Sequence, residues 1–193
     1  MPRPKSFDPD TVLAKAMGVF WEKGYDAASI SDLTAAMGIN RFSLYDTFGD
    51  KHELYLKALD AYSERVVGAM VDRINSIESL DDIEGLFSAM IESQHCEETS
   101  PCCMMHRAAI SLAAVDDEAR KRVELARERF HGAFHDALGR IQRTGALRSD
   151  LDLNQAAWLL MITKSGLESY KGSPVPADEA NGAVGALLAQ FRA

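Results

Sequence analysis

Residues 29–54 read SISDLTAAMGINRFSLYDTFGDKHEL and predict two short helices joined by a tight turn, with a third helix following at once. Ser29 can cap the first helix, because its side chain can accept from the backbone N–H three residues on, and Asp32 complements the helix dipole. Gly38 supplies the permissive backbone that a sharp turn needs. Asn40 is a good N-cap for the second helix. This order is a helix-turn-helix.

The apolar residues of this stretch recur at helical spacing and define an inner face. That face comprises Ile30, Leu33, Met37, Ile39, Leu44 and Phe48. The residues of the second helix that are left outside are Arg41, Phe42, Ser43 and Tyr45.

A cation stands at an unusual position in the third helix. Asp50 is the expected N-cap and Glu53 holds the capping-box position, which places Lys51 in the first turn. A positive charge there opposes the helix dipole by about 0.3–1 kcal/mol, a cost that disappears when an anion such as a DNA phosphate binds nearby. The position of Lys51 therefore argues for DNA binding.

One more helix is predicted upstream of the helix-turn-helix. Asp8 is its N-cap, Pro9 suits its first position, and Gly24 ends it. Its inward face carries Val12, Ala16, Val19 and Phe20. Residues 1–57 are therefore expected to form a three-helix, homeodomain-like DNA-binding head.

Residues 20–54, FWEKGYDAASISDLTAAMGINRFSLYDTFGDKHEL, resemble the N-terminal domain of the tetracycline-repressor (TetR) family of bacterial transcriptional regulators. The residues that match the family pattern around the recognition helix in register are Gly38, Leu44, Tyr45, Phe48, Lys51 and Leu54. The chain departs from the pattern at Asn40, where Ser is common, and at Phe42, where Gly, Pro or Ala is common. These departures leave DNA binding intact and affect which operator is read.

The resemblance implies eight DNA contacts. Those expected on phosphates are Tyr45, Thr47 and Lys51, and those expected on the DNA backbone from the preceding helix are Ser29 and Ser31. The residues expected to face base edges are Arg41, Phe42 and Ser43. Arg41 is the best candidate for reading a guanine. Phe42 either contacts a thymine methyl group or packs on its own domain, and Asp46 is expected to be solvated.

Charge supports DNA binding less than the motif does, since the formal net charge is −8. Residues 1–57 carry seven basic and eight acidic side chains, so most of the negative charge lies in residues 58–193. Binding should therefore depend on a few placed contacts and on dimerisation. The N-terminus lacks the apolar stretch of a signal peptide, and a cytoplasmic protein is expected.

Residues 58–193 are expected to form a larger helical domain for effector binding and dimerisation, with helices broken near 79, at 99–101, at 145 and at 172–176. No candidate strand is visible, so the fold class is all-α, with about nine helices. The longest helix, 117–144, should be amphipathic. Its apolar stripe is Val123, Ala126, Phe130, Phe134, Ala137 and Ile141.

Residues 144–170, TGALRSDLDLNQAAWLLMITKSGLESY, also resemble the family, in which such a turn precedes a helix that pairs with its copy. Small residues in the last two helices would let a second subunit approach closely in a C2 homodimer. They are Ala156, Ala157, Ser165, Gly166, Gly182, Ala183, Gly185, Ala186 and Ala189.

The family places a small-molecule effector pocket among the middle helices, and the apolar content favours an apolar or aromatic ligand. The candidate lining residues are Tyr62, Phe87, Met90, Cys103, His106, Phe130, Phe134, Trp158, Met161 and Tyr170. Because any helical bundle must fill itself with such side chains, most of them are expected to be ordinary core.

Residues 95–106, HCEETSPCCMMH, bring together Cys96, Cys102 and Cys103 with two histidines. Three interpretations compete: buried packing of small apolar side chains, a thiol sensor near His106 and Arg107, or a zinc-type metal site. Packing is favoured, because the segment resembles a family pattern in which Cys102 would be a small buried apolar residue. Adjacent cysteines fit no standard metal spacing, and no metal or cofactor is expected. Three cysteines in a cytoplasmic chain do not imply a structural disulfide.

Two other classes of protein fit the sequence less well. An enzyme would need a placed nucleophile or acid pair, and a recombinase would need a metal-binding carboxylate signature; neither pattern is visible. The sequence therefore predicts a non-enzymatic, homodimeric regulator, by default a repressor. Two recognition helices about 34–36 Å apart would bind a palindromic duplex operator, and a ligand or thiol modification would release it.

Overall fold

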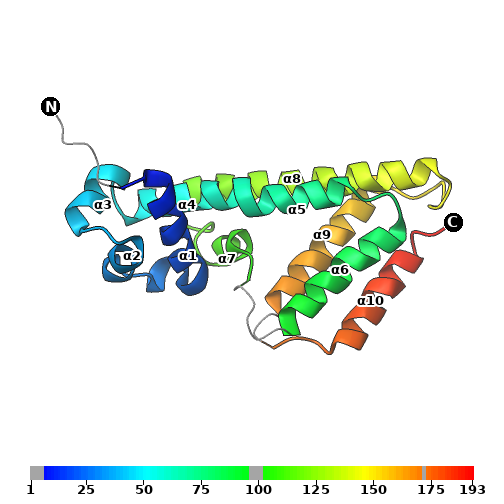
Figure 1. Cartoon of the computed structure of the whole chain (residues 1–193). Coiled ribbons are helices and arrows are strands. Elements are labelled where there is room, and N and C mark those ends of the chain that lie inside the picture. The colour runs from blue at the N-terminus through cyan, green and yellow to red at the C-terminus, as the bar shows by residue number, and fades with distance from the viewer. Residues whose placement is uncertain (1–6, 96–101, 171–172) are drawn as a thin grey trace. The chain divides into compact units, whose positions relative to one another are not determined.

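The computed structural model describes residues 7–95, 102–170 and 173–193, and these residues are almost entirely helical (Figure 1). The helices are α1 (Pro9–Ala27), α2 (Ile30–Met37), α3 (Arg41–Phe48), α4 (Lys51–Tyr62), the π-helical segment η1 (Ser63–Val67), α5 (Gly68–Asn75), α6 (Leu80–His95), α7 (Met104–Ser111), α8 (Asp117–Arg143), α9 (Leu153–Ser169) and α10 (Ala177–Ala189). Extended pairing in the described part is confined to an isolated bridge between Leu147 and Arg192. The all-α prediction is confirmed.

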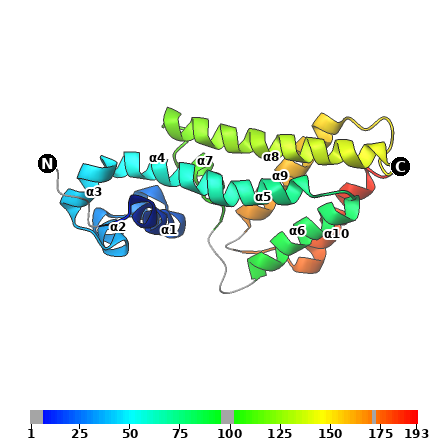
Figure 2. The same cartoon turned by 45° about the horizontal axis from the view of Figure 1, so that its top comes forward.

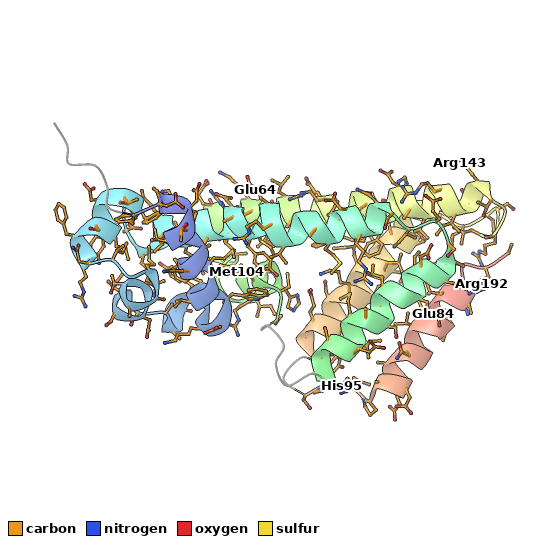
Figure 3. The ribbon with its side chains drawn as sticks, viewed as in Figure 1. Glu64, Glu84, His95, Met104, Arg143 and Arg192 are labelled. Atoms are coloured by element: carbon orange, nitrogen blue, oxygen red, sulfur yellow. The ribbon has the colours of Figure 1, made fainter. Side chains whose placement is uncertain are left out.

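The expected number of helices also holds. Helix α4, η1 and α5 follow one another without a gap from residue 51 to residue 75, with Glu64 in the π-helical segment (Figure 3). Counted as one, they bring the described helices to about nine. The predicted long helix 117–144 is α8, and the expected breaks at 79 and 145 lie between helices, while 99–101 fall outside the described residues.

The chain divides into two compact units, and each unit is made of two separate stretches of the chain. Unit 1 comprises residues 1–66 and 103–124, and unit 2 comprises residues 67–102 and 125–193. Unit 1 thus contains α7 and the beginning of α8 in addition to the predicted head. No helix in the described ranges is long and apolar enough to cross a membrane.

Unit 1 is organised around α1, which packs against α2, α4 and α7. Aromatic rings fill the centre: Phe20 and Tyr55 meet edge to face with centroids 5.0 Å apart, and Tyr25 lies 5.0 Å from the Tyr55 ring. Burial raises the pKa of Tyr55 to about 12, so its phenol is neutral at physiological pH. The other buried members include Leu33, Met37, Leu44, Phe48 and Leu54.

Two polar links join α4 to α8 within unit 1. His52 contacts the carboxylate of Asp116, which also caps α8 by accepting from the backbone N–H of Ala119 at 2.9 Å. This cap is the main cause that holds the pKa of Asp116 below its ordinary value. Arg122 donates to both carboxylate oxygens of Asp60, at 2.8 and 3.0 Å. Such a two-pronged bond fixes direction as well as distance.

In unit 2, α6 packs against both α9 and α10, and α6 and α10 lie side by side in both views (Figure 1 and Figure 2). The expected α8 stripe is confirmed from Ala126 to Ile141, whereas Val123 is half-buried. Phe87 of α6 stacks on Phe134 of α8 with ring centroids 6.3 Å apart. Near the C-terminus, Arg192, which Figure 3 labels, pairs with Asp81 at 2.9 Å.

An ion pair within α9 lies largely buried in this apolar interior. Lys164 of α9 is 5% exposed, and its ammonium lies 2.8 Å from the carboxylate of Glu168. The same ammonium sits 4.5 Å from the centroid of the Phe130 ring, in cation–π geometry. The ring and the carboxylate together replace the water that the charge has lost.

Candidate nucleic-acid interface

Helix α2 begins with the predicted capping box. The Ser29 hydroxyl accepts from the backbone N–H of Asp32 at 3.1 Å, and the Asp32 carboxylate accepts from the backbone N–H of Ser29 at 3.0 Å. Lys23 of α1 also donates to Asp32 at 2.7 Å. The hydrogen bond from Lys23 is the largest cause that lowers the pKa of Asp32, followed by the bonds from Ser29. The start of α2 is therefore pinned to α1.

The turn between α2 and α3 is also as predicted. Gly38 adopts the left-handed conformation (φ 70°, ψ 29°), which a residue without a side chain reaches at little cost. Asn40 then accepts from the backbone N–H of Ser43 at 2.8 Å and starts α3. Helices α1, α2 and α4 carry an acidic residue in the first turn, but α3 begins with Arg41. The N-terminal end of α3 thus stays positive and suits an anionic partner.

The outer face of α3 separates cleanly from the core. Leu44 and Phe48 are buried, whereas Phe42 is 79% exposed and Tyr45 is 48% exposed. Of the two interpretations of Phe42, packing on its own domain is therefore wrong for this structure. Arg41 and Asp46 are exposed, as expected, and Ser43 is half-buried.

The remaining predicted contacts differ in accessibility. Ser31 is exposed on α2, and the Ser29 hydroxyl is engaged in the capping box. The Thr47 hydroxyl is buried and has no hydrogen-bond partner among the residues that the structure describes. A phosphate contact by Thr47 would therefore need a local movement of α3, after which the phosphate would satisfy a hydroxyl left without a bond.

Lys51 is held in place by the end of α1. Its ammonium lies 4.6 Å from the centroid of the Tyr25 ring and 3.4 Å from the backbone carbonyl oxygen of Asp26. Asp50 caps α4 by accepting from the backbone N–H of Glu53 at 2.8 Å. The Lys51 ammonium, which opposes the α4 dipole, is therefore held by the Tyr25 ring face and the Asp26 carbonyl. This contact orders the ammonium before an anion binds.

The residues that support Lys51 were not predicted from the sequence. Tyr25 and His52 give no local signal for their roles, because their partners lie far along the chain. The position of Asp116 directly before the predicted helix is typical of a helix cap, but nothing in the sequence indicates its contact with His52. These residues connect the proposed phosphate contact to α1 and α8.

The ten predicted effector residues fall in both units. Unit 1 holds Tyr62, Cys103 and His106, and unit 2 holds Phe87, Met90, Phe130, Phe134, Trp158, Met161 and Tyr170. Trp158 and Tyr170 are 39% and 53% exposed. None of the ten lines any of three hollows in the described structure, of about 400, 520 and 540 Å³. Their pocket role stays a prediction.

The cysteine segment is only partly described. Cys96 lies outside the described residues, whereas Cys102 and Cys103 are half-buried immediately before α7, which begins at Met104 (Figure 3). Within the described ranges, no group of three or more His, Cys, Asp or Glu side chains could hold a metal ion. Because Cys96 lies outside these ranges, the structure does not test the metal interpretation of the whole segment, and packing and thiol chemistry are the interpretations that concern Cys102 and Cys103 alone.

The small residues expected at the dimer interface differ in exposure. Ala156 and Ala157 are buried inside their own chain, so the prediction that they admit a second subunit is wrong. On α10, by contrast, Gly182, Ala183, Ala186 and Ala189 are exposed. Helix α9 additionally exposes Leu159 (44%) and Ile162 (64%). Small and apolar side chains are therefore accessible on both final helices.

Comparison with known proteins identifies relatives. Residues 12–58 match the model of the family described as bacterial regulatory proteins, tetR family. An uncharacterized HTH-type transcriptional regulator of Bacillus subtilis, YezE, is 33% identical over 169 residues, covering 86% of this chain and 87% of YezE. The HTH-type transcriptional repressor ComR of Escherichia coli is 35% identical over 107 residues, covering 53% of this chain and 50% of ComR.

Solved structures show the same fold. A cysteine mutant of the TetR family transcriptional regulator CifR, solved with a 26-base-pair double-stranded operator DNA, has a TM-score of 0.81. It is 28% identical, and the match covers 97% of this chain and 98% of that chain. The similarity therefore extends beyond the helix-turn-helix to nearly the whole chain.

Proposed function

Because the chain belongs to the TetR family of bacterial regulatory proteins, we propose that this DNA-binding transcriptional regulator is a homodimeric repressor whose palindromic operator is released by a small ligand. The family and the relatives are transcriptional regulators rather than enzymes. Residues 1–57 would bind DNA and residues 58–193 would bind the effector and a second subunit. Its target, chromosomal DNA, would place the protein in the cytoplasm.

The observation that carries the proposal is the outward face of α3 beside a fixed Lys51. Arg41, Phe42 and Tyr45 are exposed at a helix end without an acidic residue, and Lys51 is already ordered by Tyr25. An ordered cation loses little freedom when it meets a phosphate. The remaining proposed DNA contacts are Ser29, Ser31, Ser43 and Thr47.

A homodimer supplies the second half-site. In helix-turn-helix dimers the recognition helices enter successive major grooves about 34–36 Å apart, so the operator repeats with two-fold symmetry. The exposed residues of α9 and α10 support an interface through these two helices, because an accessible face of small and apolar residues allows close helix packing.

Ligand release would act through α4. The effector, apolar or aromatic in character, would bind within residues 58–193 at some of the candidate residues named above, and a shift of α4 would change the spacing of the recognition helices. Because Lys51 is the first residue of α4, such a shift would also move a proposed phosphate contact. If saturating effector left operator affinity unchanged, this induction model would fail.

A thiol-responsive variant of this function is the second candidate. Cys102 and Cys103 directly precede α7, and α7 packs on α1 and α4 in unit 1. The structure of the relative CifR with operator DNA is that of a cysteine mutant. A bulky or charged thiol adduct at Cys103 would disturb the start of α7 and, through it, the head.

Selection of bound fragments from genomic DNA tests both candidates. The purified full-length protein would be incubated with sheared DNA, with and without a thiol reductant, and the retained fragments sequenced. A shared palindrome in both conditions is the expected result. Recovery that depends on the reductant would favour the thiol variant, and Cys102→Ser and Cys103→Ser would locate the thiol. No enriched duplex in either condition would contradict the proposed function.

A further inference from the structure

Phe42 lies at the N-terminal end of α3, the part of the proposed DNA interface that would reach the bases. It is the second residue of α3, and the N-terminal residues of the second helix in a helix-turn-helix are those that reach base edges. With 79% of its surface exposed, its ring lies on the outside of the head rather than in the core. Tyr45, one helical turn on, is also exposed, so the two rings form an aromatic ridge along α3.

The chemistry of a phenyl ring restricts what Phe42 can recognise. The ring has no hydrogen-bond donor or acceptor with which to read the polar edge of a base. In the major groove the apolar feature that distinguishes one base pair from another is the C5-methyl group of thymine. We propose that Phe42 reads a thymine methyl group in each operator half-site, next to the base contacted by Arg41.

The neighbours of Phe42 support contact with DNA rather than with an apolar protein surface. Arg41 precedes it at the positive end of α3, and no acidic residue lies in that first turn. Burying this guanidinium against an uncharged partner would be costly, whereas duplex DNA offers guanine and phosphate acceptors beside the methyl group. The proposal rests on the proposed function and adds a base preference to it.

The test replaces single thymines of the selected operator by deoxyuridine, which removes the methyl group and keeps every Watson–Crick hydrogen bond. Each substituted duplex would be titrated with wild type and with Phe42→Ala. For wild type we expect one thymine position per half-site at which the change raises Kd about 3- to 10-fold, as the removal of one apolar methyl group from the interface implies. For Phe42→Ala the same change should alter Kd less than about 2-fold, because the partner ring is gone.

Two control variants separate this role from general effects. Phe42→Leu keeps an apolar side chain and should retain part of the thymine preference. Tyr45→Phe keeps the aromatic ridge but removes the hydroxyl of a proposed phosphate contact, so it should weaken binding to all duplexes while leaving the deoxyuridine profile unchanged. Because Phe42 is exposed, these substitutions should fold normally, which circular dichroism would verify.

The outcomes are distinguishable. Equal sensitivity to deoxyuridine in wild type and Phe42→Ala would overturn the proposal while leaving operator binding intact. Insensitivity of the wild type at every thymine would overturn it too. If the wild type bound no specific duplex at all, the proposed function would fail first and this inference with it.

Discussion

Arg107 of α7 donates a hydrogen bond to the backbone carbonyl of Trp21 in α1, with 3.1 Å between Nη1 and the oxygen. The same nitrogen donates to the carbonyl of Glu22 at 3.0 Å. Two residues later the backbone leaves the helix at Gly24, where φ is 80°. These two carbonyls lie near the end of the regular part of α1, and Arg107 donates to both of them from a distant part of the chain.

Replacing Arg107 should destabilise unit 1. Arg107→Met keeps an unbranched stem but removes the charged group that donates both hydrogen bonds, so we expect the free energy of unfolding to fall by about 1.5–3 kcal/mol. Urea titration followed by circular dichroism would measure it. As the matched control, Lys121→Met removes a cation from an exposed pair and should change stability by less than about 0.5 kcal/mol. Equal effects of the two substitutions would contradict the capping role.

Arg41 and Lys51 should differ in the kind of DNA binding that they support. Arg41→Ala should cost about 1–3 kcal/mol on the preferred operator and relax the preference at one base position. Lys51→Ala should weaken binding to all duplexes alike and lower the salt slope by about 1, because one phosphate is no longer neutralised. Titrations of operator variants at several salt concentrations would measure both. A uniform loss of affinity for Arg41→Ala would argue against base reading.

Glu168→Gln should be more harmful than removing the whole buried ion pair. The single change leaves the Lys164 ammonium in an apolar interior, where breaking a buried pair typically costs about 3–5 kcal/mol. The double variant Lys164→Met with Glu168→Leu removes both charges and should lie within about 1 kcal/mol of wild type. Urea unfolding at neutral pH would compare them, and a double variant as unstable as the single one would refute this account.

Acid should weaken the start of α2 through Asp32. The folded state lowers the pKa of this carboxyl below its ordinary value of 3.8, so the ionised form is the stabilising one. Its contribution is complete above about pH 5 and is lost as the pH falls below about 4 towards the folded-state pKa. The free energy of unfolding should therefore depend less on pH in Asp32→Asn than in wild type. Parallel curves for the two proteins would exclude this linkage, and Asp46→Asn, on the exposed face of α3, is the control.

Ile162→Asp should weaken the proposed homodimer. Ile162 is 64% exposed on α9, so a charge there is harmless in a monomer but would be buried between two copies. Sedimentation velocity should show a shift towards monomer, and operator affinity should fall with it. Val115, 82% exposed in unit 1, offers the control Val115→Asp, which should leave the dimer unchanged. A dimer that tolerates Ile162→Asp would place the interface elsewhere.

The sequence predicts those parts of the fold that short-range chemistry determines. The caps at Ser29, Asn40 and Asp50 and the turn at Gly38 each depend on residues within one helical turn, and the structure contains all four. The same periodicity left Phe42 off the inner face, but only its exposure in the structure excluded packing on its own domain. For this reason the helix-turn-helix was the most predictable part of the molecule.

Contacts between distant residues were not predictable in this way. Lys164 reads as a surface lysine until α8 covers it, and Ala156 reads as a contact for a second subunit although its own chain buries it. The support of Lys51 by Tyr25 depends on how α1 meets α4, which no single segment encodes. The effector residues share this difficulty, because core and pocket use the same side chains.

The arginine cap on α1 also bears on the order of events during synthesis. Arg107 lies 86 and 85 residues after Trp21 and Glu22, whose carbonyls it binds. Asp116, the partner of His52, follows it by 64 residues, and Arg122, the partner of Asp60, follows it by 62. When the helix-turn-helix leaves the ribosome, these stabilising partners have not yet been translated. Helices α1 and α4 would therefore gain all of these partners only after residue 122 has emerged, which would delay the completion of unit 1 in a nascent chain.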